Sequence, residues 1–428
     1  MKNRIKQYLL AASMCVGLTA CSDFFEPIPG VQFGLDETFA SKQRTEEYLN
    51  NVYSYVREVT DAIHPNTYGG IFTEASLDGA NRWNKTYAEW TNGSFNSASA
   101  QASEYFSKYY QAIAKASTFI QNVDKCTEAA ASTRGKWKSE ARALRAYYYF
   151  ELLRLYGPIP LIGEDPIPLD ASLEELIKER NSVDECVNFI ATELQSAIDS
   201  GDLLQRAGKA NLGRMDVATC MALKAKLYLY WASPLFNGNT DQASVKNKDG
   251  KQLFPQTEDN SKWTQARDAY ERFMTFATGQ GYKLTEVYTN GKLDPYASCR
   301  AAGEFFTTTW EAVDELIFVK LRDLYDYTYW VCPKFTDFQD TDVTGGGGYY
   351  TTQETVDLFF TKDGLTIEED PGYDKFEGIP SANNFTSGRY YDPNNPSRLY
   401  FDADKSKVLK QWKDREPRFY VNITYSGS

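Results

Sequence analysis

The chain has 428 residues, enough for one large or two ordinary domains. Its 42% hydrophobic and 24% charged content is typical of a globular protein, so composition excludes a largely disordered chain. The net charge of −12 argues against nucleic acid as a partner, because nucleic-acid binding needs a basic surface. Aromatic residues make up 15% of the chain, and its 30 tyrosines suit surfaces that bind a ligand while staying wet.

Residues 1–20 have the pattern of an export signal. Three basic side chains precede a short apolar stretch, 9–17, which is too short to span a membrane. Leu-Thr-Ala-Cys at its end is similar to the lipobox of bacterial lipoproteins, in which the cysteine is acylated and becomes the first residue. We therefore predict that Cys21 is lipidated and that 21–428 is the mature chain. The acidic stretch 22–26 resembles one associated with display on the outer face of the cell.

Apolar residues recur at helical spacing from about residue 41 to residue 279, with one long loop, Asp61 to Asn96, near the start. Gly157-Pro158 ends the third of the helices that this spacing predicts. Amphipathic helices with modest connections favour stacked helical hairpins. The apolar stripes of the predicted helices fall within 49–59, 105–123, 133–156, 183–198, 214–232 and 266–277.

An internal repeat supports the hairpins. Ala-Leu-Arg-Ala at 143–146 and Ala-Leu-Lys-Ala at 222–225 both precede a tyrosine-rich stretch and a proline-containing stop, at an offset close to two tetratricopeptide-type units. In a stack of hairpins a helix has partners on most faces. We therefore predict that the run Tyr147–Phe150 is buried core, not a ligand site. Trp137, Trp231 and Trp263 also lie on predicted helices and are interpreted as core.

The sequence contains no recognisable catalytic or metal-binding pattern. His64 is the single histidine, which leaves a histidine-based triad or multi-histidine metal site without partners. No cysteine pair has metal or redox spacing, and Cys186 and Cys220 lie on apolar helical faces. Asp340 and Asp342 begin like a calcium loop, but its twelfth position lacks the required glutamate. We predict no catalytic residue, no metal site and no cofactor, with calcium as the one open alternative.

Four stretches resemble, in order, markers of the SusD/RagB-like family of outer-membrane nutrient-binding lipoproteins. The most recognisable is EARALRAYYYFELLRLYGPIPLI at 140–162. The others are ALKAKLYLYWASPLFNG at 222–238, YYTTQETVDLFFTKDG at 349–364, and DREPRFYVNITYSG at 414–427, which is similar to a strand of the family.

The resemblance implies a mainly α-helical fold, with tetratricopeptide-like hairpins supporting an irregular, loop-rich half that carries a few short strands. Residues 41–279 would form the helical-repeat part and 280–428 the irregular part. Family members usually continue beyond the Phe419-Tyr420 stretch, so we expect their last helical segment to be missing here. The resemblance also implies a partner, a SusC-like TonB-dependent transporter, and a location on the outer membrane, anchored by lipid and facing the exterior.

Two aromatic clusters are the candidate ligand-binding residues. The loop Asp61 to Asn96 is too long for a plain connection. A second cluster follows a predicted strand, Leu316 to Leu321, and its tyrosines alternate so that they share one face of an extended segment. Indole and phenol faces match the apolar face of a sugar ring, and amides reach its hydroxyls. The predicted ligand-binding residues are Trp83, Trp90, Asn81, Asn92, Tyr325, Tyr327, Tyr329 and Trp330.

Three functional classes follow. A surface glycan-binding lipoprotein that delivers oligosaccharide or polysaccharide to the transporter explains the anchor, the aromatic loops and the family markers. A peptide-binding receptor of the same architecture is the alternative, because aromatic loops also suit peptides. A glycoside hydrolase needs only two carboxylates, but nothing in the sequence specifically supports one. We predict that the protein is not an enzyme.

Overall fold

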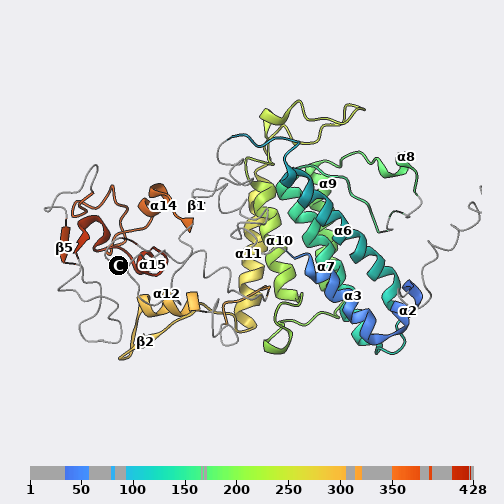
Figure 1. The fold of residues 1–428 in the computed structure, drawn as a ribbon, viewed down its shortest axis with the longest axis horizontal. Helices are drawn as coiled ribbons and strands as arrows, with labels where there is room; N and C mark the ends of the chain where they lie inside the picture. Colours follow the sequence, from blue (N-terminus) through green and yellow to red (C-terminus); the bar gives the residue numbers. More distant parts are fainter. Residues whose placement is uncertain are drawn as a thin grey trace, which may run out of the picture.

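The computed structural model describes residues 34–56, 79–81, 93–164, 167, 171–304, 314–320, 349–375, 385–387, 407–423 and 425. Long helices form one half, and short elements from the C-terminal part of the chain gather beside it (Figure 1). The fold is mainly α-helical, as the sequence predicted. No helix in the described ranges is long and apolar enough to cross a membrane.

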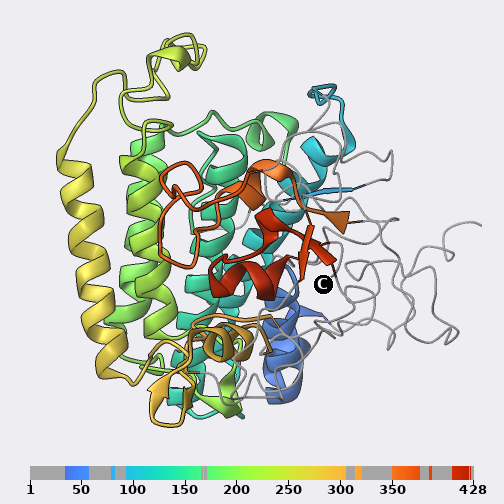
Figure 2. The same cartoon turned by 90° about the vertical axis from the view of Figure 1, so that its left-hand side faces the viewer.

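Each long helix packs on the next in a row (Figures 1 and 2). α3 lies against α6 and α7, α7 against α9, α9 against α10, and α10 against α11. This row confirms the predicted stack of helices. The helices of this half are α2 (Leu35–Ala40), α3 (Lys42–Ser54), α6 (Ala100–Asn122), α7 (Ala131–Tyr156), the short α8 (Leu173–Leu176), α9 (Val183–Asp199), α10 (Val217–Ala232) and α11 (Ser261–Gly279), with 3-10 turns at Val123–Lys125, Lys209–Asn211 and Thr240–Gln242.

Local side chains begin and end these helices. Ser182 and Glu185 form a reciprocal capping box at the start of α9, and Asp216 accepts a hydrogen bond from the Thr219 amide at the start of α10. Gly157 ends α7 at φ +68°, a conformation that favours glycine. A Cβ at this position would lie 3.0 Å from the Phe254 ring, so space as well as backbone geometry favours glycine.

The aromatic run in α7 is buried, which confirms its predicted role as core. Each of its four rings contacts a ring on a different neighbouring segment. Tyr148 stacks 6.0 Å from Tyr109 of α6, and its hydroxyl donates a hydrogen bond to the Val52 carbonyl of α3. The ring-centroid contacts of the other three are Tyr147 with Phe318 at 6.1 Å, Tyr149 with Phe189 of α9 at 5.2 Å, and Phe150 with Tyr230 of α10 at 5.6 Å.

The C-terminal half contains three helices and three two-stranded antiparallel ribbons among its described residues. Its helices are α12 (Pro295–Glu304), α14 (Gln353–Asp357) and α15 (Pro417–Asn422), with a 3-10 turn at Lys410–Trp412. The ribbons pair β1 (Ala80–Asn81) with β4 (Tyr349–Tyr350), β2 (Tyr288–Thr289) with β3 (Lys292–Leu293), and β5 (Phe385–Ser387) with β6 (Lys407–Leu409). β1 therefore joins a segment from the first hundred residues to this half.

Three predictions about individual segments are wrong. The described part of the predicted strand Leu316 to Leu321, residues 316–320, is irregular, because Lys320 and the Ile317 carbonyl are hydrogen-bonded to the helical half instead of to another strand. The DREPRFY stretch is not one strand: Arg415 makes an isolated antiparallel bridge with Thr361, and helix α15 begins at Pro417, in a first turn where proline is tolerated. Trp263 is 42% exposed, because α10 is the only helix in the described ranges that packs closely on α11. Trp137, Trp231, Cys186 and Cys220 are buried as predicted.

Candidate functional site

The β1–β4 ribbon joins two segments that are far apart in the sequence. Ala80 pairs with Tyr350 and Asn81 with Tyr349 (Figures 1 and 2). β1 lies inside the long loop in which the sequence predicts ligand-binding residues, and β4 directly follows the four-glycine run at 345–348. The pairing therefore joins residues 80 and 81 of the predicted loop to the C-terminal half.

Helix α14 follows this ribbon and is fixed to the C-terminal half. The Thr352 hydroxyl accepts a hydrogen bond from the Thr355 amide at the start of α14. Behind α14, the fully buried Arg415 guanidinium donates to the Val356 and Phe359 carbonyls at 2.8 and 2.7 Å. Arg415 thus satisfies carbonyl groups where α14 ends, which helps to hold the ribbon in place.

Aromatic rings surround the Arg415 guanidinium. It lies 5.0 Å from the Phe419 ring centroid, and its Nη1 donates to the Tyr373 hydroxyl at 3.0 Å. Burial raises the pKa of Tyr373, and the Arg415 charge opposes that rise. This cluster accounts for Arg415 and Phe419 of the DREPRFY stretch, since a buried arginine is stabilised by acceptors and by ring faces.

Tyr350 is a surface residue that the sequence analysis missed as a site candidate. It is 55% exposed beside Ala80 of the ribbon. A tyrosine pair after a glycine run is too common a sequence pattern to mark a site, and only the pairing with β1 distinguishes Tyr350. Arg415 likewise belongs to a sequence motif that by itself indicates no role for it.

Most of the predicted site lies outside the described residues. Of the predicted ligand-binding residues, only Asn81 falls in a described segment, in β1. The remaining seven, Trp83, Trp90, Asn92, Tyr325, Tyr327, Tyr329 and Trp330, lie outside it, as do Cys21, His64, Asp340 and Asp342. Their predicted roles stay predictions.

Two buried carboxylates in the helical half have raised pKa values. Burial raises the pKa of Glu140, although the Arg214 charge and a hydrogen bond from the Tyr53 hydroxyl oppose the rise. Burial also raises the pKa of Asp216, which accepts hydrogen bonds from the Thr219 and Ala207 amides. Both carboxylates join packed segments of the helical half, and we assign them structural roles. Within the described ranges, no group of three or more potential ligand side chains could hold a metal ion.

Comparison with known proteins places this chain in a family. A family model described as "Starch-binding associating with outer membrane" matches residues 32–229, and the model of the SusD family matches residues 315–428. A SusD-like protein of Bacteroides ovatus is 27% identical over 175 residues, which cover 39% of this chain and 30% of that protein.

Two solved structures share the fold. BT4246 has a TM-score of 0.69 and 25% identity, with 89% of this chain and 64% of that chain covered. A SusD-like protein (BF3747) from Bacteroides fragilis has a TM-score of 0.64 and 20% identity, with 93% and 64% covered. This chain thus spans less than two thirds of the length of either. The two family models cover most of the chain from both ends, and the structural likeness extends over nearly all of it, so the protein belongs to the SusD family.

Proposed function

We propose that this protein is a cell-surface lipoprotein that binds glycans and delivers them to a SusC-like, TonB-dependent outer-membrane transporter. The observation that carries the proposal is the β1–β4 ribbon, which pairs Ala80, three positions before Trp83 in the sequence, with the exposed Tyr350. Membership of the SusD family supports glycan as the ligand class, because one matching family model is described as starch-binding and associated with the outer membrane.

The chemistry of sugars agrees with this surface. Sugars carry many hydroxyls and few charges, so they are held by flat apolar faces with amides at the edges. The loop supplies indoles at positions 83 and 90 and amides at positions 81 and 92. The net charge of −12 favours neutral glycans, since long-range repulsion opposes capture of sulfated or uronate-rich chains.

Membrane attachment is a separate part of the proposal. Lipidation at Cys21 would anchor the chain, and the acidic residues that follow it suit display toward the exterior. An acidic protein gains nothing from anionic lipid, so the acyl chains would supply the anchoring.

Titration calorimetry against neutral oligosaccharides, acidic glycans and peptides tests the ligand class. We expect neutral saccharide to bind, and Trp83→Ala or Trp90→Ala to weaken it roughly 5- to 150-fold, which corresponds to a lost aromatic anchor of about 1–3 kcal/mol. Trp263→Ala is the matched control, because that indole is exposed on α11 in the helical half.

The outcomes separate the alternatives. Binding of peptides without saccharide would identify a peptide receptor of the same fold. Wild-type glycan affinity in both loop variants would show that the site is not in this loop.

The partner has a separate test, which is recovery of a TonB-dependent transporter together with the protein from mildly solubilised outer membranes. Absence of the transporter under conditions that preserve glycan binding would refute delivery to such a transporter.

A further inference from the structure

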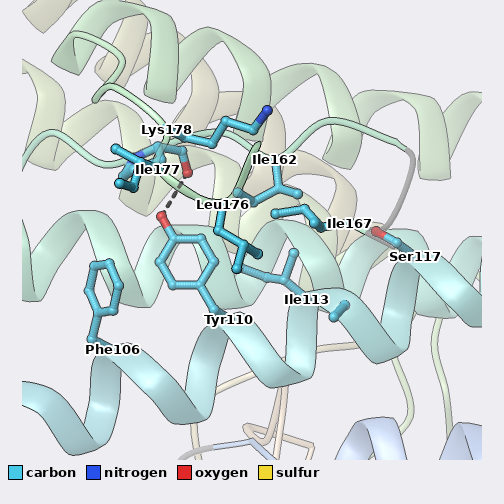
Figure 3. A pocket seen from close by; sticks show the side chains of 11 residues that line it. Phe106, Tyr110, Ile113, Ser117, Ile162, Ile167, Leu176, Ile177 and Lys178 are labelled. Atoms are coloured by element: carbon cyan, nitrogen blue, oxygen red, sulfur yellow. Dashed lines mark hydrogen bonds between the residues drawn. The ribbon is translucent and has the colours of Figure 1, made fainter. Parts of the chain in front are cut away.

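A cavity of about 390 Å³ lies in the helical half, between α6 and the chain that connects α7 to α9 (Figure 3). In Figure 1, α6 and α8 lie to the right of α10 and α11, whereas the β1–β4 ribbon lies to their left. The cavity is therefore separate from the proposed glycan site, and neither the family comparison nor the sequence analysis assigns it a role.

The floor of the cavity is one stripe of α6. Phe106, Tyr110, Ile113 and Ser117 follow each other at helical spacing along it (Figure 3). The first and last are eleven positions apart, so the floor is about 16 Å long. A cavity of about 390 Å³ is of a size that holds a small-molecule ligand.

The polar groups on this floor already have partners. The Tyr110 hydroxyl donates to the Pro160 carbonyl at 2.7 Å, and burial raises its pKa, so it stays protonated. The Ser117 hydroxyl accepts from the Arg145 guanidinium at 3.0 Å. A guest with many hydroxyls or amides would lose its bonds to water without replacement, at a cost of about 1–3 kcal/mol for each group. Sugars and peptide backbone are therefore poor guests, and a plain hydrocarbon chain is a good one.

The opposite wall is held in position by hydrogen bonds. The Ile162 amide donates to the Tyr149 hydroxyl and the Leu161 amide to the Asn181 side chain, each at 3.0 Å. Ser172 and Glu175 cap α8 reciprocally and so fix the turn that precedes Ile177. Because these hydrogen bonds hold residues 161, 162 and 172–175 of this wall, a guest does not have to order them, which favours binding.

The rim combines exposed apolar side chains with one cation. Leu176 and Ile177 line the cavity yet are 51% and 69% exposed. Lys178 follows them and is exposed, and hydrogen bonds from Ser172 together with the Lys178 charge lower the pKa of Glu175. An anionic head group at this end would meet the Lys178 ammonium, while the apolar rim would cover the first carbons of a chain.

We propose that this cavity binds a straight-chain carboxylate of the medium-chain fatty-acid class. The alkyl chain would lie along the α6 stripe toward Ser117, and the carboxylate would lie at Lys178. The alkyl chain would supply most of the binding free energy. The head group adds little, because the pair would be exposed and the carboxylates of Glu174, Glu175 and Glu179 are near Lys178 in the sequence.

Titration of the Cys21→Ala protein from the soluble fraction with hexanoate, octanoate and decanoate tests the proposal, because an unlipidated chain needs no detergent that would compete. Each added methylene is expected to tighten binding roughly fourfold, the equivalent of about 0.8 kcal/mol. An affinity that does not change with chain length would overturn the proposal, since it would show that the hydrocarbon is not buried.

Two variants place the ligand in this cavity. Ala114→Trp fills it from an exposed position on α6 that lines it, and should abolish decanoate binding; Gln111→Trp, one turn away and outside the lining, should not. Equal decanoate affinity in Ala114→Trp and wild type would refute the site.

The position of the carboxylate has a separate test. Lys178→Gln should weaken decanoate binding about two- to fivefold and leave decanol binding unchanged. Equal effects on both ligands would refute the placement of the carboxylate. Glycan affinity in Ala114→Trp should match wild type, so this test stands apart from that of the proposed function.

Discussion

Arg145 and Glu193 form a buried ion pair between α7 and α9. The Arg145 Nε donates to Glu193 Oε2 at 2.7 Å, and the two side chains are 0% and 5% exposed. The other carboxylate oxygen accepts from Arg142 at 3.1 Å, and Arg145 also donates to Ser117 of α6. Three helices of the row are therefore joined by one charged cluster.

Removing one charge of this pair should cost far more than removing both. Glu193→Gln leaves the Arg145 charge buried without a counter-ion, and we expect the free energy of unfolding to fall by about 3–5 kcal/mol. The double change Arg145→Met with Glu193→Leu should recover most of that loss, because no charge is then left buried. Urea denaturation measures both. A single variant as stable as wild type would show that the pair contributes nothing to the helix row.

The aromatic run should be sensitive to truncation. Tyr148→Ala and Leu152→Ala each remove a fully buried side chain from α7, and we expect losses of about 2–5 kcal/mol. Tyr148→Phe keeps the ring and loses only the hydrogen bond to the Val52 carbonyl, so its cost should be about 1–3 kcal/mol. Thermal and chemical unfolding check the order. A Tyr148→Ala protein that unfolds normally but no longer binds glycan would contradict the core assignment.

Acid should weaken the start of α9. A hydrogen bond from Lys251, and further hydrogen bonds from Ser182, lower the pKa of Glu185 to about 2. Because the folded-state pKa lies below the usual 4.5, the ionised group stabilises the fold above about pH 4.5, and this contribution is lost as the pH falls toward 2. Glu185→Gln keeps the cap but loses the charge, so it should cost less than about 1 kcal/mol at neutral pH for this exposed pair. Its stability should converge with that of wild type by pH 2; a gap that persists there would contradict the electrostatic account.

Breaking the β1–β4 ribbon should affect ligand binding more than folding. Ala80→Pro removes a backbone donor and restricts the chain where it pairs with Tyr350. We expect weaker glycan binding with unfolding of the helical half unchanged. Lys292→Pro makes the same change in the β2–β3 ribbon and should bind glycan normally. Equal glycan affinity in the two variants would show that the ribbon does not position the site.

The anchor has its own test. Cys21→Ala removes the acylated thiol, so the protein should accumulate as precursor or appear in the soluble fraction instead of the outer membrane. Fractionation with radiolabelled palmitate checks both lipid and location. A processed variant that stays membrane-bound would refute the lipobox assignment.

Local sequence was enough to determine the helical half. The predicted third helix, from about 133 to 156, corresponds to α7 at Ala131–Tyr156, and the 183–198 stripe to α9 at Val183–Asp199. The reason is that periodicity, caps and stops act within a few residues of each other. The aromatic run was also assigned correctly, because a repeat at 143–146 and 222–225 implied neighbouring helices.

Features that depend on distant partners were decided only by the tertiary structure. Trp263 has a helical position like that of Trp231, yet it is exposed because no further described helix packs on α11. The residues from Pro417 onward form a helix beside the buried Arg415. The Arg415 guanidinium donates hydrogen bonds to the carbonyls of residues 356 and 359, which are far from it in the sequence. The pairing of Ala80 with Tyr350 spans 270 positions, and no local pattern encodes a contact of that separation, because its energy arises only when the intervening chain has folded.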